Sequence, residues 1–178
     1  AMGAVAEAVY AGVDGIHSSI NGLGERTGNV ATEEVVAAME LLLNVKTGIN
    51  LKLIDKVTKR VEEITGIAIP SNKPVTGKKL FWLESGVVVQ AKSRIENAGI
   101  PAAMTPYLPS VTGREPIKVV LGGSSGKENI QYYLDKHNIP YDDTFDFDGV
   151  LAKVKTLSRE KRRVLEDAEF LEIVNGKR

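Results

Sequence analysis

The feature that most constrains this chain is a glycine-rich loop between a short apolar segment and a helix. Residues 21–29 read NGLGERTGN, so three glycines surround a carboxylate, a guanidinium and a carboxamide. The segment before it, 14–20, is apolar at positions 16 and 20 and predicts a strand, whereas residues 32–42 predict a helix. Strand, polar loop and helix in this order form a βα unit, and in α/β barrels the loop after the strand carries the chemistry. We therefore expect this loop to bind a ligand.

Composition excludes several classes of function. Basic and acidic residues number 23 each among 178, so no net field attracts nucleic acid or an anionic membrane. The absence of cysteine excludes disulfides, thiolate metal ligands and a cysteine nucleophile. No apolar run approaches the ~20 residues of a membrane span, and the N-terminus lacks the pattern of a signal peptide. We expect a soluble, cytoplasmic protein that binds neither nucleic acid nor membrane.

The remaining elements follow from periodicity and from breaks at glycine and proline. Residues 51–66 are the clearest helix, because apolar residues recur there at steps of three and four and Gly66 closes the run. Residues 67–77, with two prolines, predict an extended connector. Further predicted elements are a helix over 1–11, a helix over 80–97 interrupted at Gly86, a strand over 117–121, and helices over 126–137, 146–160 and 167–174. One strand and two helices cannot bury their own apolar faces, so we expect residues 1–46 to need packing partners.

A second glycine-rich run, GGSSGK at residues 122–127, also lies between a predicted strand and a predicted helix. Free backbone N–H groups and the helix dipole at such a place could hold an anion. The run is not a phosphate-binding Walker loop, because Leu121 and Glu128 stand where that motif needs glycine and a hydroxyl residue. We favour a structural turn and helix cap over an anion site.

Few residues are candidates for chemistry outside these loops. His17 and His137 are the only histidines, and neither has a second ligand at metal-binding spacing, so a complete metal site within the chain is not expected. His17 is better explained as a packed or hydrogen-bonded strand residue, and His137 as a charge at a helix end. Tyr107 lies between Pro106 and Pro109 in a stiff segment. There it is either a buried aromatic with a bonded hydroxyl or a positioned donor, and both alternatives stay open.

These residues carry a family resemblance. Residues 11–14, 20–29 and 32–36 resemble the last strand, loop and helix of the metal-dependent TIM-barrel Claisen enzymes. That family includes 2-isopropylmalate, homocitrate and citramalate synthases, with hydroxymethylglutaryl-CoA lyase as a lytic relative. The string GERTGN is its most specific part. Similar segments continue through the synthases' linker and C-terminal subdomains, at residues 69–74, 84–86, 106–109 and 123–127.

The resemblance implies a fold and a division of the chain. It implies an α/β protein that corresponds to the C-terminal portion of such a synthase. Residues 1–47 would be the last βα unit of a TIM barrel, 48–115 a helical linker subdomain, and 116–178 a small α/β C-terminal subdomain.

The resemblance also implies an acyltransferase of amino-acid biosynthesis. In such enzymes a divalent metal (Mg, Mn or Zn) holds an α-keto acid, and the enolate of acetyl-CoA attacks its keto carbon. Asn29 matches a metal ligand in the loop, and a carboxamide oxygen suits a hard cation. Tyr107 matches a tyrosine that the neighbouring subunit delivers to the active site, which implies a dimer with residues 78–115 crossing between subunits. By the same resemblance we count Glu25 with Tyr107 as catalytic candidates, and Arg26 with Ser19 as candidates for substrate binding.

Two departures bear on the function. The family's Asp strand and His-x-His strand are missing, so we expect the chain alone to be inactive, with the rest of the barrel on another chain or removed. Val88 stands where the synthases carry a catalytic histidine. This favours an alternative, a non-catalytic assembly or regulatory subunit of such an enzyme. A lyase like hydroxymethylglutaryl-CoA lyase is a lesser alternative, because that family lacks the linker and C-terminal subdomains.

Overall fold

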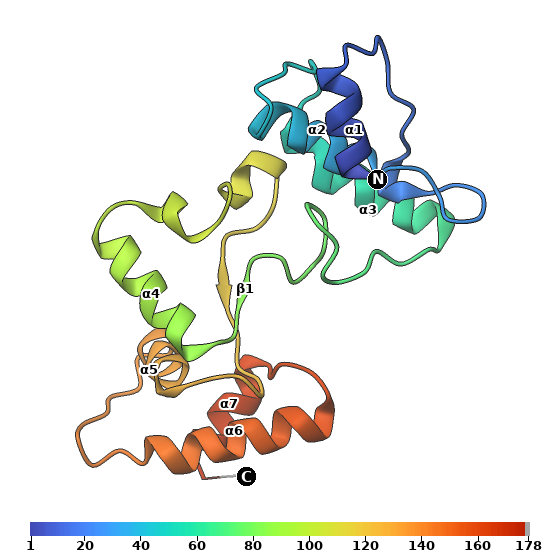
Figure 1. The fold of residues 1–178 in the computed structure, drawn as a ribbon. Helices are drawn as coiled ribbons and strands as arrows, with labels where there is room; N and C mark the ends of the chain where they lie inside the picture. Colours follow the sequence, from blue (N-terminus) through green and yellow to red (C-terminus); the bar gives the residue numbers. More distant parts are fainter. Residues whose placement is uncertain (177–178) are drawn as a thin grey trace. The chain divides into compact units, whose positions relative to one another are not determined.

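The computed structural model describes residues 1–176 and shows a mixed α/β chain (Figure 1). The chain divides into two compact units. Unit 1 comprises residues 1–81 and 107–116, and unit 2 comprises residues 82–106 and residue 117 onward. The α-helices are α1 (Met2–Tyr10), α2 (Thr32–Leu41), α3 (Ile54–Thr65), α4 (Gly86–Asn97), α5 (Lys127–Lys136), α6 (Phe147–Lys161) and α7 (Asp167–Val174). The short elements are the 3-10 turns η1 (Ile20–Gly22), η2 (Leu51–Leu53), η3 (Pro101–Met104) and η4 (Pro109–Thr112), and the strands β1 (Trp82–Leu83) and β2 (Lys118–Val119).

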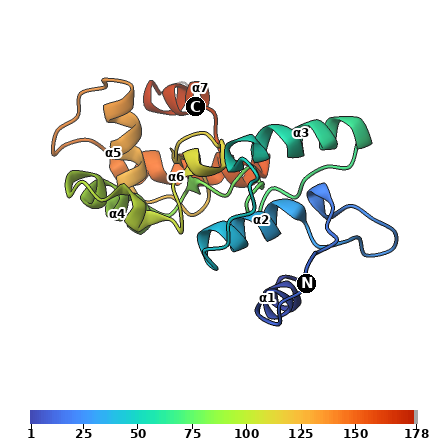
Figure 2. The ribbon, with the colours of Figure 1, turned by 90° about the horizontal axis from the view of Figure 1, so that it is seen from above.

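Unit 1 is built on α1, α2 and α3, which lie together in Figures 1 and 2. Its small core is formed by Ala37, Ile54 and Val75, with Leu51 packed against them. The acidic first turn of α2 suits the positive end of the helix dipole. Gly66 ends α3 in the left-handed conformation, as the sequence predicts. This unit holds the glycine-rich loop that precedes α2.

The segment 107–116 is joined to the rest of unit 1 by an ion pair between largely covered side chains. The Arg114 guanidinium pairs with the Asp55 carboxylate of α3 and donates to the carbonyls of Thr76 and Gly77, at 3.0 and 2.9 Å. Because the arginine side chain is only 10% exposed, this fork joins three parts of the unit that are far apart in sequence.

Unit 2 packs four helices, α4 to α7, around a two-stranded parallel sheet. Trp82 is paired with Lys118, and Leu83 with Val119. Its core is larger than that of unit 1 and draws on β2 and on every helix of the unit. The buried core residues are Val89, Val119, Leu121, Ile130, Tyr133, Leu134, Val154, Leu165, Phe170 and Ile173.

Most predicted helices are confirmed, and two predicted elements are wrong. Residues 14–20 are not a strand: only Ser19 makes a single parallel bridge, to Ala31, because the described residues bring no neighbouring strand beside the segment. The helix predicted from residue 80 begins only at Gly86, because residues 82–83 pair with β2 instead. A short apolar run is compatible with a helix as well as with a strand, so its sequence alone does not decide between them.

The mixed α/β class is confirmed, whereas the TIM-barrel and subdomain assignments to 1–47, 48–115 and 116–178 stay predictions. The last two residues of that third segment lie outside the described residues. Across residues 1–176, every helix falls short of the length and hydrophobicity that a bilayer span requires.

Candidate functional site

The loop between η1 and α2 is closed at its base by backbone hydrogen bonds. The Ser19 N–H donates to the Val30 carbonyl at 3.1 Å, and the Thr32 N–H donates to the Ser19 carbonyl at 2.9 Å. The two ends of the loop therefore lie side by side where the chain enters α2. Residues 20–30 form a compact surface loop of the kind that commonly carries function.

The loop's glycines are explained by its own packing. Gly28 has φ +75°, and a Cβ placed on it would lie 2.0 Å from the Gly22 carbonyl oxygen. A Cβ on Gly24 would lie 3.1 Å from the Asn29 carboxamide nitrogen. The glycines let the backbone fold onto itself, so they are not by themselves evidence that a ligand approaches the backbone.

Three of the predicted site side chains lie on the outside of this closed loop. Glu25 and Arg26 are exposed at a turn that the Gly28 N–H closes on the Glu25 carbonyl at 3.1 Å. Arg26 takes a left-handed backbone conformation, φ +63°, which is unfavourable for a residue with a Cβ. Asn29 is exposed as well, and its amide nitrogen donates to the Leu23 carbonyl at 3.4 Å. That bond uses the nitrogen of the carboxamide, so its oxygen is the atom that could bind a cation.

Ser19 is placed at the base of the loop and is half-buried. Its hydroxyl donates to the Leu23 carbonyl, so this hydrogen bond stabilises the closed loop. The structure thus brings Ser19, Glu25, Arg26 and Asn29 together on one loop.

Tyr107 lies on a different segment of unit 1. Its ring meets Phe81 edge to face, with centroids 5.9 Å apart, and its hydroxyl lies near the Thr112 side chain. Burial raises the pKa of Tyr107, and the Thr112 side chain and the nearby Arg114 charge oppose that rise. In both views the segment 107–112 (yellow) lies away from the loop 20–30 (blue) (Figures 1 and 2). These contacts match the packed-aromatic alternative; a role for Tyr107 in a partner subunit's site stays a prediction.

Residues 1–176 do not by themselves make a site for a divalent metal. They contain no group of three or more His, Cys, Asp or Glu side chains placed to hold an ion. Asn29 offers one neutral oxygen, which is too few ligands for a hard cation that takes six or more oxygens. The assignment of Asn29 as a ligand therefore depends on ligands beyond those that residues 1–176 bring together.

The second glycine-rich loop, 122–126, is occupied by the protein's own side chains. Glu84 accepts a hydrogen bond from the Ser124 N–H at 2.8 Å, and a Cβ on Gly122 would lie 2.5 Å from the same carboxylate oxygen. The Ser125 hydroxyl accepts from the Gly122 N–H at 2.9 Å. Asn129 accepts from the Gly126 N–H, also at 2.9 Å. Because internal acceptors take up these N–H groups, the predicted structural turn and helix cap is confirmed.

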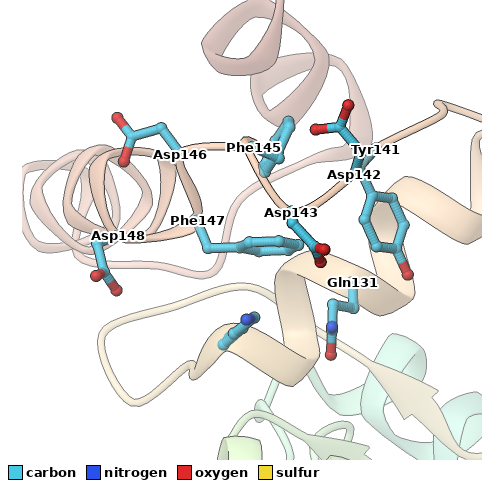
Figure 3. A pocket seen from close by; sticks show the side chains of 9 residues that line it. Gln131, Tyr141, Asp142, Asp143, Phe145, Asp146, Phe147 and Asp148 are labelled. Atoms are coloured by element: carbon cyan, nitrogen blue, oxygen red, sulfur yellow. The ribbon is translucent and has the colours of Figure 1, made fainter.

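Sequence reasoning missed a pocket of about 480 Å³ in unit 2 (Figure 3). The sequence signal for this pocket is the string DDTFDFD at residues 142–148, in which carboxylates alternate with aromatic rings. Aromatic rings and carboxylates line the pocket together, but two carboxylates have structural tasks. Asp142 accepts from the Thr144 backbone and hydroxyl, which lowers the pKa of Asp142. Asp146 caps α6 by accepting from the Gly149 N–H at 2.8 Å. The lining residues are Lys127, Gln131, Tyr141, Asp142, Asp143, Phe145, Asp146, Phe147 and Asp148.

Comparisons with known proteins support the family resemblance that the glycine-rich loop motif predicts. Residues 1–61 match the HMGL-like family. The chain is 42% identical over 159 residues to a protein named 2-isopropylmalate synthase in Ignicoccus hospitalis, covering 89% of this chain and 38% of the relative. It is 36% identical over 174 residues to homocitrate synthase of Methanocaldococcus jannaschii, covering 96% of this chain and 41% of the relative.

A third relative, named (R)-citramalate synthase in Archaeoglobus fulgidus, is 34% identical over 167 residues, or 93% of this chain and 32% of that protein. The chain thus spans about two fifths or less of the length of these relatives. The resemblance predicted from the sequence is confirmed: this chain is a relative of the 2-isopropylmalate, homocitrate and citramalate synthases over most of its own length.

Proposed function

We propose that this chain is part of an acyl-CoA-dependent carboxylate synthase that condenses acetyl-CoA with an α-keto acid. The observation that carries the proposal is sequence identity of 34–42% to three such synthases across 89–96% of the chain. The structure adds that the loop typical of this family closes on itself and leaves Glu25, Arg26 and Asn29 exposed. These side chains are free of packing tasks in the core, so they are available to a ligand.

The polar side chains of the loop have separate roles in this proposal. Asn29 would give one oxygen to a divalent ion, Mg, Mn or Zn, whose other ligands come from outside this chain. The Arg26 guanidinium suits a carboxylate or phosphate of the substrates, because its fork of donors matches such groups. Glu25 supports the reacting groups beside it, and Ser19 contributes by holding the loop shut. Tyr107 would act at the loop of a partner subunit.

The exposed apolar surface of unit 1 supports an assembly with further protein. A groove of about 180 Å³ between α2, η2 and α3 is lined mainly by apolar side chains, among them Val36, Leu53 and Val57. Leu42 and Ile64 are 78% and 68% exposed in the same unit. Such surface favours burial against a partner. We propose a homodimer, a separate chain that carries the rest of the barrel, or both, and no activity for this chain alone.

A non-catalytic assembly or regulatory subunit is the second candidate. Val88, on the first turn of α4, stands where the family resemblance implies a histidine, and it is 38% exposed. An aliphatic side chain cannot transfer a proton, so this one observation favours a subunit that keeps the fold without the chemistry.

A chimeric enzyme tests the two candidates. This chain would replace the matching part of the Ignicoccus hospitalis relative, and release of free CoA would be followed with acetyl-CoA, a panel of α-keto acids and a divalent metal. The synthase proposal predicts turnover by the chimera and none by the chain alone. A folded chimera without turnover would favour the assembly subunit, and turnover by the chain alone would contradict our account of the missing ligands.

A further inference from the structure

The first residue of the glycine-rich loop is attached to two helices at once. The Asn21 N–H donates to the Glu33 carboxylate of α2 at 3.0 Å. The Asn21 side-chain nitrogen donates to the Thr58 carbonyl of α3 at 2.9 Å. Asn21 also takes a left-handed conformation, φ 59°, which bends the chain into the loop. Its two hydrogen bonds therefore hold an unfavourable backbone geometry in place.

Glu33 is the buried member of this arrangement. It is 1% exposed, and within the described residues its Oε1 atom has no hydrogen-bond donor. The charge on that oxygen is met by the Lys73 ammonium, 3.5 Å away, which also pairs with Glu34 at 2.6 Å. A carboxylate buried this deeply is costly unless a counter-charge lies near it. Lys73 supplies that charge from the connector that follows α3.

We propose that Glu33 is a positioning residue for the loop 21–29 and that Lys73 is its counter-ion. The chain of contacts runs from Lys73 to Glu33 to Asn21, so the geometry of the loop depends on a connector residue whose ion pairs are both on α2. What the loop binds rests on the proposed function, whereas this arrangement concerns the chain's own residues. The prediction that separates it from ordinary packing is that Lys73 affects the loop only through the charge of Glu33.

Amide hydrogen exchange on the 178-residue chain tests the proposal. Glu33→Ala removes the acceptor of the Asn21 N–H, so exchange at Asn21, Gly22 and Gly28 should become about tenfold faster or more. Lys73→Met should loosen the same amides, because it leaves the buried carboxylate without its counter-charge. Adding Glu33→Gln to Lys73→Met should restore slow exchange, because the carboxamide oxygen still accepts from Asn21 and needs no cation. The matched control is Glu34→Gln, which changes the other partner of Lys73 and should alter loop exchange less than about twofold.

Three results would overturn the proposal: unchanged loop exchange in Lys73→Met, no restoration by Glu33→Gln, or equal loosening by Glu34→Gln. Amides of α2 and α3 report whether each variant is folded. If Glu33→Ala unfolds the unit, the comparison of Lys73→Met with the double variant Lys73→Met, Glu33→Gln decides, because both keep an oxygen acceptor for the Asn21 N–H at position 33. Faster exchange in Lys73→Met that the added Glu33→Gln does not reverse would count against the proposal. An inactive chimera would leave all of these results intact, so the two proposals fail separately.

Discussion

Two glycine-rich loops precede helices in this chain, and they differ in what occupies them. The loop 21–29 packs its glycines against its own backbone and keeps Glu25, Arg26 and Asn29 on the outside. The loop 122–126 encloses side chains of the same protein, Glu84 and Asn129, which accept its N–H groups. The first loop exposes polar side chains, whereas the backbone N–H groups of the second loop donate to side chains of the same protein. A glycine-rich run before a helix is therefore evidence for a ligand only when polar side chains of the run are exposed and keep groups that can bind it.

The largest expected effect comes from adding one methyl group to the first loop. In Gly28→Ala the new Cβ would meet the Gly22 carbonyl at 2.0 Å in a left-handed backbone, so the loop cannot close. We expect a loss of about 4 kcal/mol in the free energy of unfolding, the upper end for one substitution. Urea unfolding followed by circular dichroism measures it. Gly123→Ala is the control from the second loop, because nothing lies within 4 Å of its Cβ; equal stability of the two variants would remove the packing explanation.

The next effect tests whether the second loop is a structural joint. Asn129 is fully buried and makes three bonds, from the Gly126 N–H and to the Glu84 and Val120 carbonyls. Asn129→Ala leaves all three backbone groups unpaired, which should cost about 3 kcal/mol. Fluorescence of Trp82, which lies in β1 of the same unit, follows the unfolding. Gln131→Ala, on the same helix, should change stability by less than about 0.5 kcal/mol. A small loss of stability in Asn129→Ala would mean that contacts other than these three hydrogen bonds hold the second loop in place.

Glu84→Ala should have a smaller effect on the same loop. It removes the acceptor of the Ser124 N–H at an only half-buried place, so we expect a loss of about 1–2 kcal/mol. Glu84→Gln keeps an acceptor and should recover most of it. Exchange at the Ser124 amide, read beside unfolding, checks the cause: equal effects of alanine and glutamine would show that the hydrogen bond is not responsible.

The smallest effect has the opposite sign. Arg26 is exposed and takes φ +63°, so Arg26→Gly should relieve strain and stabilise the chain by about 0.5–1 kcal/mol. Glu25→Ala, also exposed, should leave stability within about 0.5 kcal/mol. Thermal unfolding of the pair measures both. Destabilisation by Arg26→Gly would show that the side chain has a structural task, and the contrast between the loops would weaken.

The sequence predicted the helices well because their signals are local. Gly66 ends α3 as expected, and the apolar spacing gave α5, α6 and α7 within a few residues. The two failures involve pairing between distant segments. Residues 82–83 form a strand only because residues 118–119 lie beside them, and residues 14–20 stay irregular because the described residues offer no such neighbour. Periodicity in one segment contains no information about its partner.

The candidate site was predicted in its outer part only. The motif points to the exposed side chains of Glu25, Arg26 and Asn29, but it does not predict that the buried Glu33 holds the loop in place. Glu33 belongs to a helix start, where an acidic residue is unremarkable by sequence, and its pairing with Lys73 spans 40 positions of the chain. Long-range ion pairs of this kind require the fold to be known.

Our central proposal is that the first loop takes part in the chemistry, whereas the second loop has a structural role. Turnover of the chimera described above tests it most directly, with one substitution in each loop. Asn29→Ala should lower turnover by one to two orders of magnitude, about 1.4–2.7 kcal/mol of transition-state stabilisation. Ser124→Ala, from the second loop, should change it by less than about twofold, because the substitution keeps the N–H that donates to Glu84. An Asn29→Ala chimera with unchanged turnover, or equal losses in the two variants, would contradict the account.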